Sequence, residues 1–468
     1  MFRWFLSLRY LRARKTNLIG IVGLFVGVAA LILILSIMTG FLEETRRGVR
    51  GNLSDLIVTP YFGYDPDRDV PIDPKPLLAE IQRDPKVTTE VRPDPRVVAA
   101  TAHLVWISQI AKVGAEADDM IRVMSNSQPG GLSAVQIVGI DIPQEYAATE
   151  LRTALENAPS GENVDDLEDP FAVPERFEPS PIEKGVILGV QLMDNLGLQR
   201  GDRVKLATII EDPKRSGQFI TPSRDFVVVG GFRSKENDMD MSRIYLDRRG
   251  MVDFLKSPRH FSEVLVKLAD YKRDGLALRE ELGERLSEKG LIFGCRDFRG
   301  VRVEVKTWEQ FRRSLLGAIE NERVLMGIML SLVLLVAGFT VFAILSMMVT
   351  EKRRDIGILT ALGATPQGVM TSFLMIAFWD ALIGAVLGAV VGTWGAIEID
   401  GIERWLSKTF GIEIFDRTVY LFDTIPSVVE VLSVTVIVLG AFVCSILFAA
   451  IPAWRAANLD PLEALRHE

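Results

Sequence analysis

The stretch that decides the fold is Thr350–Met370, TEKRRDIGILTALGATPQGVM, a charged island between two long apolar runs. Its charges are too costly to place in hydrocarbon, so this segment must lie outside a bilayer, on one side of it. We expect a short helix over Arg354–Leu362, because Gly363 suits the left-handed position after a C-cap. Thr365 and Pro366 suit the N-cap and first position of a second helix.

The expected short helix carries a small apolar ridge, with Ile356, Leu359 and Leu362 at i, i+3 and i+6. Charged side chains lie beside this ridge, namely Lys352, Arg353, Arg354 and Asp355. A ridge of this kind can fit a groove on another protein. The alternative is an ordinary solvated loop between two helices, and the spacing alone does not decide between the two interpretations.

Composition limits the classes of protein that fit this chain. Its 468 residues allow about three domains at typical domain size. The hydrophobic content of 48% is near average, so the membrane signal lies in where the apolar residues are placed. Cys295 and Cys444 are far apart, and no structural disulfide is expected. The net charge of -8 comes without a basic cluster, which argues against nucleic acid as the main partner.

Four segments are apolar enough to span a bilayer about 30 Å thick, which takes about 20 helical residues. They run over Leu18–Phe41, Val324–Val349, Val369–Ile397 and Val428–Ile451. The first has an apolar run about twice the length of a signal-peptide core, so we expect it to remain as an anchor.

The short flanks predict the orientation. Five cations and no acid precede the first span, namely Arg3, Arg9, Arg12, Arg14 and Lys15. The positive-inside rule therefore places the N-terminus in the cytoplasm, and with four spans the Thr350 island and the C-terminus are cytoplasmic too. The region Glu43–Asn321 then faces outside. Residues 1–17 form an amphipathic arm, which we expect to lie along the inner interface.

The second span is expected to begin well outside the membrane. Thr307 and Gln310 form a capping box, and apolar residues at helical spacing follow up to the span. A helix over Thr307–Val349 would be about 64 Å long at 1.5 Å per residue, about twice the hydrocarbon thickness. Such a stalk could carry a displacement across the membrane. The alternative is a separate interfacial helix before the span.

The outside region predicts an α+β domain in at least two lobes. Strands are expected at 97–102, 104–110, 135–140, 203–210, 226–232 and 262–268, and helices at 186–196 and 277–289. Residues 61–95 are rich in proline and are expected to be extended, and the acidic segment 145–183 is expected to be a linker. A hairpin over Glu211–Arg224 would present Lys214, Arg215 and Phe219, either to a partner or merely as a connection.

Catalytic motifs are missing from the sequence. There is no G-x-x-x-x-G-K-[ST] phosphate loop and no H-E-x-x-H, C-x-x-C or G-x-S-x-G pattern. We therefore expect neither an enzyme nor a bound cofactor or metal, and any energy for work must come from a partner.

Two features stand out inside the spans. Asp380 would cost about 2.5–3.5 kcal/mol at the bilayer centre, so it is expected to face other helices or a partner. Gly384, Gly388 and Gly392 form a G-x-x-x-G-x-x-x-G face that lets a helix approach closely. Asp380 could belong to a moving interface or could simply hold helices together, and both interpretations stay open.

Three motifs in the membrane portions carry a resemblance. They are RYLRARKTN with a first span ending in SIMTGF, the long run from TWEQF through EKRRDIGILTALGAT, and the terminal IPAWRAANLDPLEALRHE. Together they resemble lipoprotein-releasing (Lol-type) ABC transporter permeases, within a class that includes macrolide-exporter-type and cell-division permeases. The E-K-x-R-[DE]-I-x-[IL]-L-x-A-L-G-A pattern is specific for the class, whereas SIMTGF and TWEQF indicate the lipoprotein branch.

The resemblance implies a cytoplasmic coupling helix that docks into an ABC ATPase. Its expected coupling residues are Glu351, Lys352, Arg353, Asp355, Ile356, Leu359, Leu362 and Gly363. It also implies two ATPase copies that use ATP and Mg, a second permease chain that is identical or homologous, and a lipoprotein substrate. Lipid chains would enter between the first two spans, at Met38, Phe41, Met326 and Leu330. The hairpin residues Lys214, Arg215 and Phe219 occupy the place where some family members hold a periplasmic carrier chaperone.

The expected fold class is an α-helical membrane protein with four transmembrane helices and a large α+β periplasmic domain between the first two. Its expected divisions are 1–17 arm, 18–50 first helix and extension, 51–306 periplasmic domain, 307–349 stalk and second helix, 350–366 coupling helix, 367–397 third helix, 398–427 loop, 428–452 fourth helix and 453–468 tail. The expected function is lipoprotein extraction from the bacterial inner membrane. The alternatives are export of another amphiphile or peptide, and regulation of a periplasmic cell-wall hydrolase without transport.

Overall fold

The computed structural model describes residues 15–60, 64–65, 70–71, 74–82, 94–113, 133–177, 185–212, 215, 217–234, 236–256, 260–288, 292–293, 302–411 and 424–459. The chain divides into two compact units, which we call the membrane unit (Met1–Glu44 with Leu315–Glu468) and the outer unit (Thr45–Ser314). Residues 1–14 of the expected arm, the tail after Leu459 and Lys214 lie outside the described residues.

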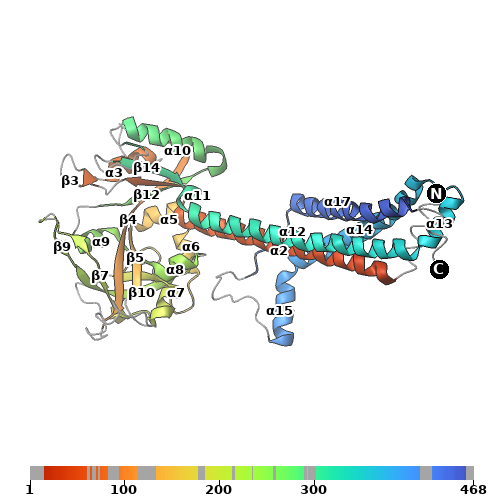
Figure 1. Ribbon diagram of the computed structural model, residues 1–468. Coiled ribbons are helices and arrows are strands. Elements are labelled where there is room, and N and C mark those ends of the chain that lie inside the picture. Colours follow the sequence, from red (N-terminus) through yellow and green to blue (C-terminus); the bar gives the residue numbers. More distant parts are fainter. Residues whose placement is uncertain are drawn as a thin grey trace. The chain divides into compact units, whose positions relative to one another are not determined.

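The membrane unit is built on four long apolar helices (Figure 1). They are α2 (Lys15–Leu53), α12 (Arg313–Glu351), α14 (Pro366–Ile397) and α17 (Val431–Ala457), each long and apolar enough to cross a membrane. They occur where the four spans are expected. Helix α2 also continues past the apolar run, as predicted, and its last turns belong to the outer unit.

The expected helix over 307–349 is two helices. The capping box of Thr307 and Gln310 is present, but it starts the short helix α11 (Trp308–Phe311), which ends at Arg312 with φ -99° and ψ 25°. Trp308 is 4% exposed and its ring packs against Tyr271, so this first turn is held by the outer unit and cannot continue straight into α12. Helix α12 alone has 39 residues, about 58 Å at 1.5 Å per residue.

A ten-stranded sheet forms the outer unit, in the order β13-β14-β1-β12-β4-β5-β11-β6-β10-β7. Its last strand β7 also pairs with β4, so the strands from β4 to β7 close into a six-stranded barrel. The strands are β1 (Leu56–Pro60), β4 (Val97–Lys112), β5 (Ser133–Ile140), β6 (Gly185–Gly189), β7 (Arg203–Ala207), β10 (Ser223–Phe232), β11 (Arg243–Asp247), β12 (Glu263–Leu268), β13 (Ile292–Phe293) and β14 (Arg302–Thr307). Two short ribbons pair β2 (Tyr64–Asp65) with β3 (Val70–Pro71) and β8 (Ile210–Glu211) with β9 (Phe219–Ile220).

Strand β4 belongs to both lobes of the outer unit. Its first half pairs with β12 up to His103, and its second half pairs with β5 from Leu104 onward. The two strands expected at 97–102 and 104–110 are thus one strand, because His103 keeps the strand register instead of breaking it.

The His103 side chain is buried between the lobes, with Nε2 2.6 Å from Glu145 Oε2 and Nδ1 3.3 Å from Glu263 Oε1. Burial lowers the pKa of His103, but the two carboxylates more than offset this effect and raise it to about 9. Burial also raises the pKa of Glu145, and the charge of His103 with its hydrogen bond brings that pKa below its usual value. The lobes therefore meet at a buried ion pair.

Each lobe has its own apolar core. The first lobe packs α3 (Pro74–Ile81) and α10 (Tyr271–Glu288) on the β1 and β12 strands around Leu56 and Phe261. The barrel interior is filled from β6, β10 and the helices α7 (Val190–Leu196) and α9 (Arg248–Leu255), with Phe226 and Phe254 edge to face. The helix α3 corrects the expectation that 61–95 is extended throughout.

The acidic segment expected to be a linker contains helices and buried apolar residues where it is described. It contains α5 (Ile142–Ala148), α6 (Leu151–Glu156) and a 3-10 turn at Glu175–Phe177. Leu151 and Leu155 belong to a core cluster outside the barrel, and Leu167 and Phe171 pack against it. Asp165, Asp166, Glu168 and Asp169 are exposed, and Asp165 pairs with Arg176 and Arg200. The expectation of a linker rested on these acids and overlooked the apolar residues between them.

Two further expectations are corrected. The expected helix over 186–196 is strand β6 followed by α7, since a Cβ at Gly189 would lie 2.1 Å from Asp240 O of α8 (Asn237–Ser242) and only a bare backbone fits there. The loop expected over 398–427 contains a helix, α15 (Ile399–Phe410), that the sequence reasoning missed.

Candidate functional site: the coupling helix and the bases of the spanning helices

A short helix, α13 (Arg353–Ala361), joins α12 to α14 (Figure 1). Gly363 has φ 97°, the left-handed conformation expected after the helix end. Thr365 Oγ1 accepts a hydrogen bond from Gly368 N at 3.2 Å, and Pro366 starts α14. The predicted helix, turn and second cap are confirmed.

The three residues of the expected ridge do not share one environment. Ile356 is 3% exposed and packs in a core cluster with residues of α12, α14 and α17. Leu359 is 37% and Leu362 81% exposed. Ile356 therefore anchors α13 to the bundle, which corrects its expected place on the exposed ridge, while Leu359 and Leu362 remain on the surface.

The charged residues beside the ridge differ in their positions and pairing. Lys352 Nζ lies 2.6 Å from Asp355 Oδ2 in the same turn, a partly exposed pair of little energetic weight. Glu351 is the last residue of α12 and Arg353 is the first of α13. The structure thus gathers the expected coupling residues in one turn region.

Both chain segments that leave the membrane unit are held by one buried carboxylate of the outer unit. Glu236 is 7% exposed, and its Oε1 lies 2.8 Å from Arg312 Nη2, in the residue between α11 and α12. Its Oε2 accepts a hydrogen bond from Asn52 Nδ2, in the last turn of α2, at 3.3 Å. The ends of α2 and α11 are therefore tied to each other through Glu236.

A second tie is formed by Asp55, which is fully buried just after α2. Its Oδ1 accepts from Arg50 Nε at 2.7 Å and its Oδ2 accepts from Leu268 N of β12 at 2.8 Å. Its carbonyl oxygen accepts from Trp308 N of α11 at 3.2 Å. Sequence reasoning missed Glu236 and Asp55, because apart from Arg50 their partners lie far along the chain and no local pattern marks them.

The residues expected to line a lipid cavity lie on α2 and on the half of α12 nearer the outer unit. Met38, Phe41, Met326 and Leu330 are all half-buried. Leu330 and Leu35 both pack against a cluster that includes Ile32 of α2, and a Cβ at Gly327 would lie 4.0 Å from Leu35. The structure thus brings Leu330 to α2.

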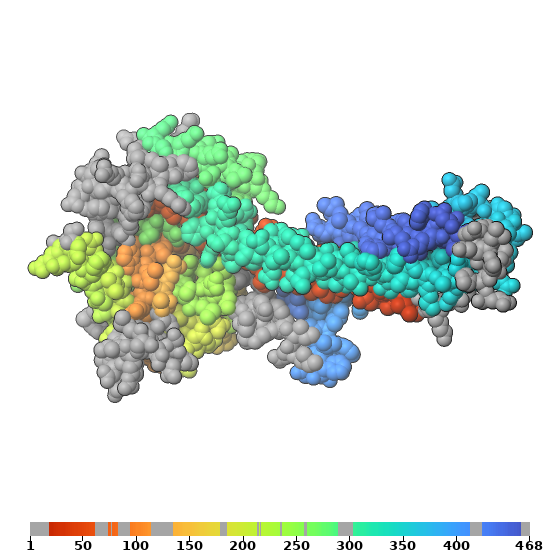
Figure 2. Space-filling view, viewed as in Figure 1, coloured from red at the N-terminus to blue at the C-terminus, as the bar shows by residue number. Residues whose placement is uncertain are grey.

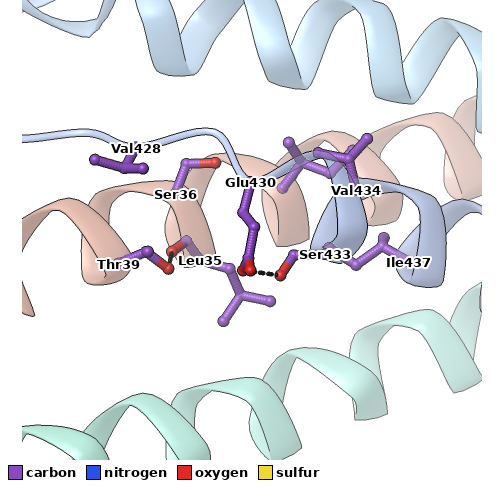
Figure 3. A pocket seen from close by; sticks show the side chains of 9 residues that line it. Leu35, Ser36, Thr39, Val428, Glu430, Ser433, Val434 and Ile437 are labelled. Carbon is purple, nitrogen blue, oxygen red and sulfur yellow. Dashed lines mark hydrogen bonds between the residues drawn. The ribbon is translucent and has the colours of Figure 1, made fainter. Parts of the chain in front are cut away.

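A small pocket lies against α2 and the start of α17 (Figure 3). Its lining includes Leu35, Ser36, Thr39, Val428, Glu430, Ser433, Val434 and Ile437. Glu430 Oε2 accepts from Ser433 Oγ at 2.7 Å and Thr39 Oγ1 donates to Leu35 O at 2.8 Å. None of the four residues expected at the lipid cavity lines this pocket, and its wall carries paired polar groups.

The glycine face of α14 packs against α2 as predicted. A Cβ would lie 3.0 Å from Ile21 O at Gly384 and 2.8 Å from Phe25 O at Gly388. Asp380 is one turn earlier on this face and is 3% exposed, so it faces the protein interior. Its Oδ1 has no hydrogen-bond partner among the described residues.

The expected hairpin is confirmed as β8 and β9, with Ile210 opposite Ile220. Phe219 is 73% exposed and Arg215 is exposed beside the turn. Within the described residues, no group of three or more His, Cys, Asp or Glu side chains could hold a metal ion.

Comparison with known families agrees with this arrangement. A MacB-like periplasmic core domain matches residues 18–280, and an FtsX-like permease C-terminal domain matches residues 327–461. The chain therefore belongs to the MacB-like family of ABC transporter permeases. It is a membrane-spanning protein with a periplasmic domain.

Relatives that match this chain over nearly their whole length indicate which branch of the permease family it belongs to. The chain is 27% identical to the lipoprotein-releasing system transmembrane protein LolC of Neisseria meningitidis serogroup B, over 99% of this chain and 98% of that protein. It is 23% identical to LolE of Haemophilus influenzae over the same shares. The macrolide export ATP-binding/permease protein MacB of Campylobacter jejuni is 24% identical over 53% of this chain and 34% of its own length. The full-length matches place the chain in the Lol-type branch.

Among solved structures, the periplasmic region of MacB from Actinobacillus actinomycetemcomitans covers 57% of this chain and 95% of its own, with 11% identity and a TM-score of 0.31. This likeness is too weak to bear on the fold.

Proposed function

We propose that the chain is the permease subunit of an ABC transporter that extracts lipoproteins from the outer leaflet of the bacterial inner membrane and passes them to a periplasmic carrier. The observation that carries this proposal is α12, one unbroken helix with α13 at one end and Arg312 directly before the other. A push on α13 would reach Glu236 of the outer unit through this helix. The full-length similarity to LolC and LolE supports lipoproteins as the cargo.

The proposed partner on the cytoplasmic side is an ABC ATPase in two copies, which would bind ATP and Mg itself. Leu359 and Leu362 supply the apolar contact, and Ile356 fixes the helix that presents them. Because Ile356 is packed against three spanning helices, force on the exposed leucines would move the bundle as well as the short helix. Both chain termini are then cytoplasmic, and the outer unit is periplasmic.

A second permease chain, identical or homologous, is the proposed neighbour of α12. No residue over 320–336 is buried within this chain, although the segment is apolar from Val324 onward. Figure 2 shows α12, in teal, open along the viewed face of the membrane unit. A second chain and the lipid chains of a substrate would cover this face, with Met326 and Leu330 nearest to α2.

Export of another amphiphile is the second candidate, and it is favoured by the similarity to the macrolide export protein over 53% of the chain. The two candidates differ in cargo rather than in mechanism.

Reconstitution tests the proposal. The full chain with its ATPase in proteoliposomes should release an acylated lipoprotein to a soluble carrier only with ATP, and should leave the same polypeptide without lipid untouched. Leu362→Asp should abolish release, whereas Phe219→Asp, at a similarly exposed residue of the outer unit, should leave ATP hydrolysis unchanged. Release of macrolides but not of lipoproteins would select the second candidate.

A further inference from the structure

Helix α15, IDGIERWLSKTF, separates its polar and apolar residues cleanly. At 3.6 residues per turn, one face carries Ile399, Ile402, Trp405, Leu406 and Phe410. The opposite face carries Asp400, Glu403, Arg404, Ser407 and Lys408. The function proposed above uses none of these residues.

Two aromatic side chains on the apolar face of α15 are exposed, whereas one acid on its polar face is buried. Glu403, on the polar face, is 7% exposed, whereas Trp405 and Phe410 are 60% and 63% exposed. Asp400 Oδ1 accepts a hydrogen bond from Ile425 N at 2.7 Å, so the polar face carries contacts to the rest of the chain. The two aromatic rings lie 6.2 Å apart, edge to face, and form one outward patch.

The position of α15 indicates what covers this patch. The helix follows the spanning helix α14 after the single residue Glu398, and it runs across the direction of α14 rather than along it (Figure 1). Trp394 and Ile397, at the end of α14, are also exposed, at 58% and 66%. Tryptophan is enriched where spanning helices reach the membrane interface, so the aromatic patch continues a lipid-facing surface.

The same end of the bundle is the periplasmic one. The segment after α15 donates a hydrogen bond from Val428 N to Ser36 O of α2 at 3.0 Å, and a Cβ at Gly40 would clash with Pro426. These contacts lie on α2 shortly before it enters the outer unit at Thr45. Helix α15 therefore lies at the outer surface of the inner membrane.

We propose that α15 is an interfacial helix that lies on the outer leaflet, with Trp405 and Phe410 inserted at the boundary of headgroups and acyl chains. An amphipathic helix of this kind buries its apolar face by about 5–10 Å. Arg404 and Lys408 flank the patch, and their charged ends can reach lipid phosphates while their stems stay along the helix. The partner surface is the phospholipid bilayer itself, whichever cargo the transporter carries.

Spin labels test this placement in the full complex, reconstituted in nanodiscs of phosphatidylethanolamine and phosphatidylglycerol. In a Cys295→Ser, Cys444→Ala background, nitroxides are attached at Trp405→Cys and Phe410→Cys, with Arg404→Cys and Lys408→Cys as matched controls. The ratio of oxygen to nickel-chelate accessibility should be several-fold higher at positions 405 and 410 than at 404 and 408. Equal aqueous access at all four positions would overturn the proposal, and so would shielding of position 405 from both reagents, which indicates a protein partner.

A conservative variant keeps the test valid if a labelled protein misfolds. The chain has 7 tryptophans, so the emission of Trp405 is taken as the difference between the wild type and Trp405→Phe. Phospholipids brominated near the top of the acyl chain should quench this difference signal strongly. A difference signal that aqueous iodide quenches and brominated lipid does not would contradict insertion.

Discussion

Helix α2 has two neighbours that contact it in opposite ways. Against α14 the main chains nearly touch, since a Cβ at Gly388 would lie 2.8 Å from Phe25 O and one at Gly392 would lie 2.9 Å from Ala29 O. Against α12 the contacts are made by side chains, with 3.9 Å between a Cβ at Gly27 and Ala337. The α2–α14 contact has no spare volume, whereas the α2–α12 contact can open without breaking a packed backbone interface.

The two halves of α12 also differ in how many of their residues are buried. Its inner half buries Val341, Leu345 and Met348 among α14 and α17 residues, whereas residues 320–336 bury none. We therefore infer that α2 and α14 form a fixed frame and that the outer half of α12 is the element that moves. Two of the four residues predicted to line a lipid cavity, Met326 and Leu330, lie on that half.

The largest effect is expected from breaking the fixed frame. Gly388→Leu places a side chain against the backbone of α2, and the cost should exceed the about 1–3 kcal/mol that is typical of an overpacked core. Gly440→Leu on α17 is the control, because nothing lies within 4 Å of its Cβ position. Size-exclusion profiles of the purified complex should show Gly388→Leu mostly lost or aggregated and Gly440→Leu intact. Equal profiles would remove the distinction between the two contacts.

The next effect concerns α13, whose exposed leucines would transmit force to α12. Leu359→Asp and Leu362→Asp should remove substrate-stimulated ATP hydrolysis while the chain still inserts and folds, because both side chains are on the surface. Ile356→Asp should instead destabilise the chain, since it buries a charge in the core cluster. ATPase rates and thermal unfolding of the same preparations separate these outcomes. Stimulated hydrolysis that survives in the leucine variants would argue against a coupling role.

A smaller effect is expected at the outer end of the moving element. Glu236→Gln keeps the shape of the side chain but removes the charge that holds Arg312, which should weaken the tie by about 1–3 kcal/mol. Lipoprotein release per ATP hydrolysed should fall, with basal hydrolysis unchanged. Glu309→Gln, at an exposed residue of the same region, is the control. A release ratio equal to that of the wild type would show that Glu236 does not carry force.

The smallest effect on the membrane contacts is expected from pH, which should change the stability of the outer unit and leave those contacts unchanged. The pKa of His103 is raised from 6.5 to about 9, so its contribution to stability is complete below pH 6.5 and is lost as the pH rises through 9. This contribution is on the order of 3 kcal/mol. Hydrogen exchange of the outer unit in the full chain should show stability falling between pH 6.5 and 9 in the wild type and much less in His103→Gln. Parallel profiles would contradict a charged His103.

The sequence predicted the parts of this architecture that depend on local patterns. The four spans, the turn at Gly363, the caps at Thr307 and Thr365 and the glycine face of α14 each follow from residues within a few turns of one another. The burial of Ile356 and the ties through Glu236 and Asp55 do not, because they depend on residues that only the tertiary fold brings together. The acidic segment 145–177 misled the interpretation for the same reason, since its apolar residues acquire partners only on the barrel surface.

Photocrosslinking from α13 tests the central claim most directly. With p-benzoylphenylalanine in place of Leu362 in intact membranes, illumination should join the chain to the ABC ATPase, with a yield that changes between the ATP-bound and nucleotide-free states. The same group in place of Phe219, in the outer unit, should never reach the ATPase. No ATPase adduct at position 362, or an adduct at position 219, would contradict the account.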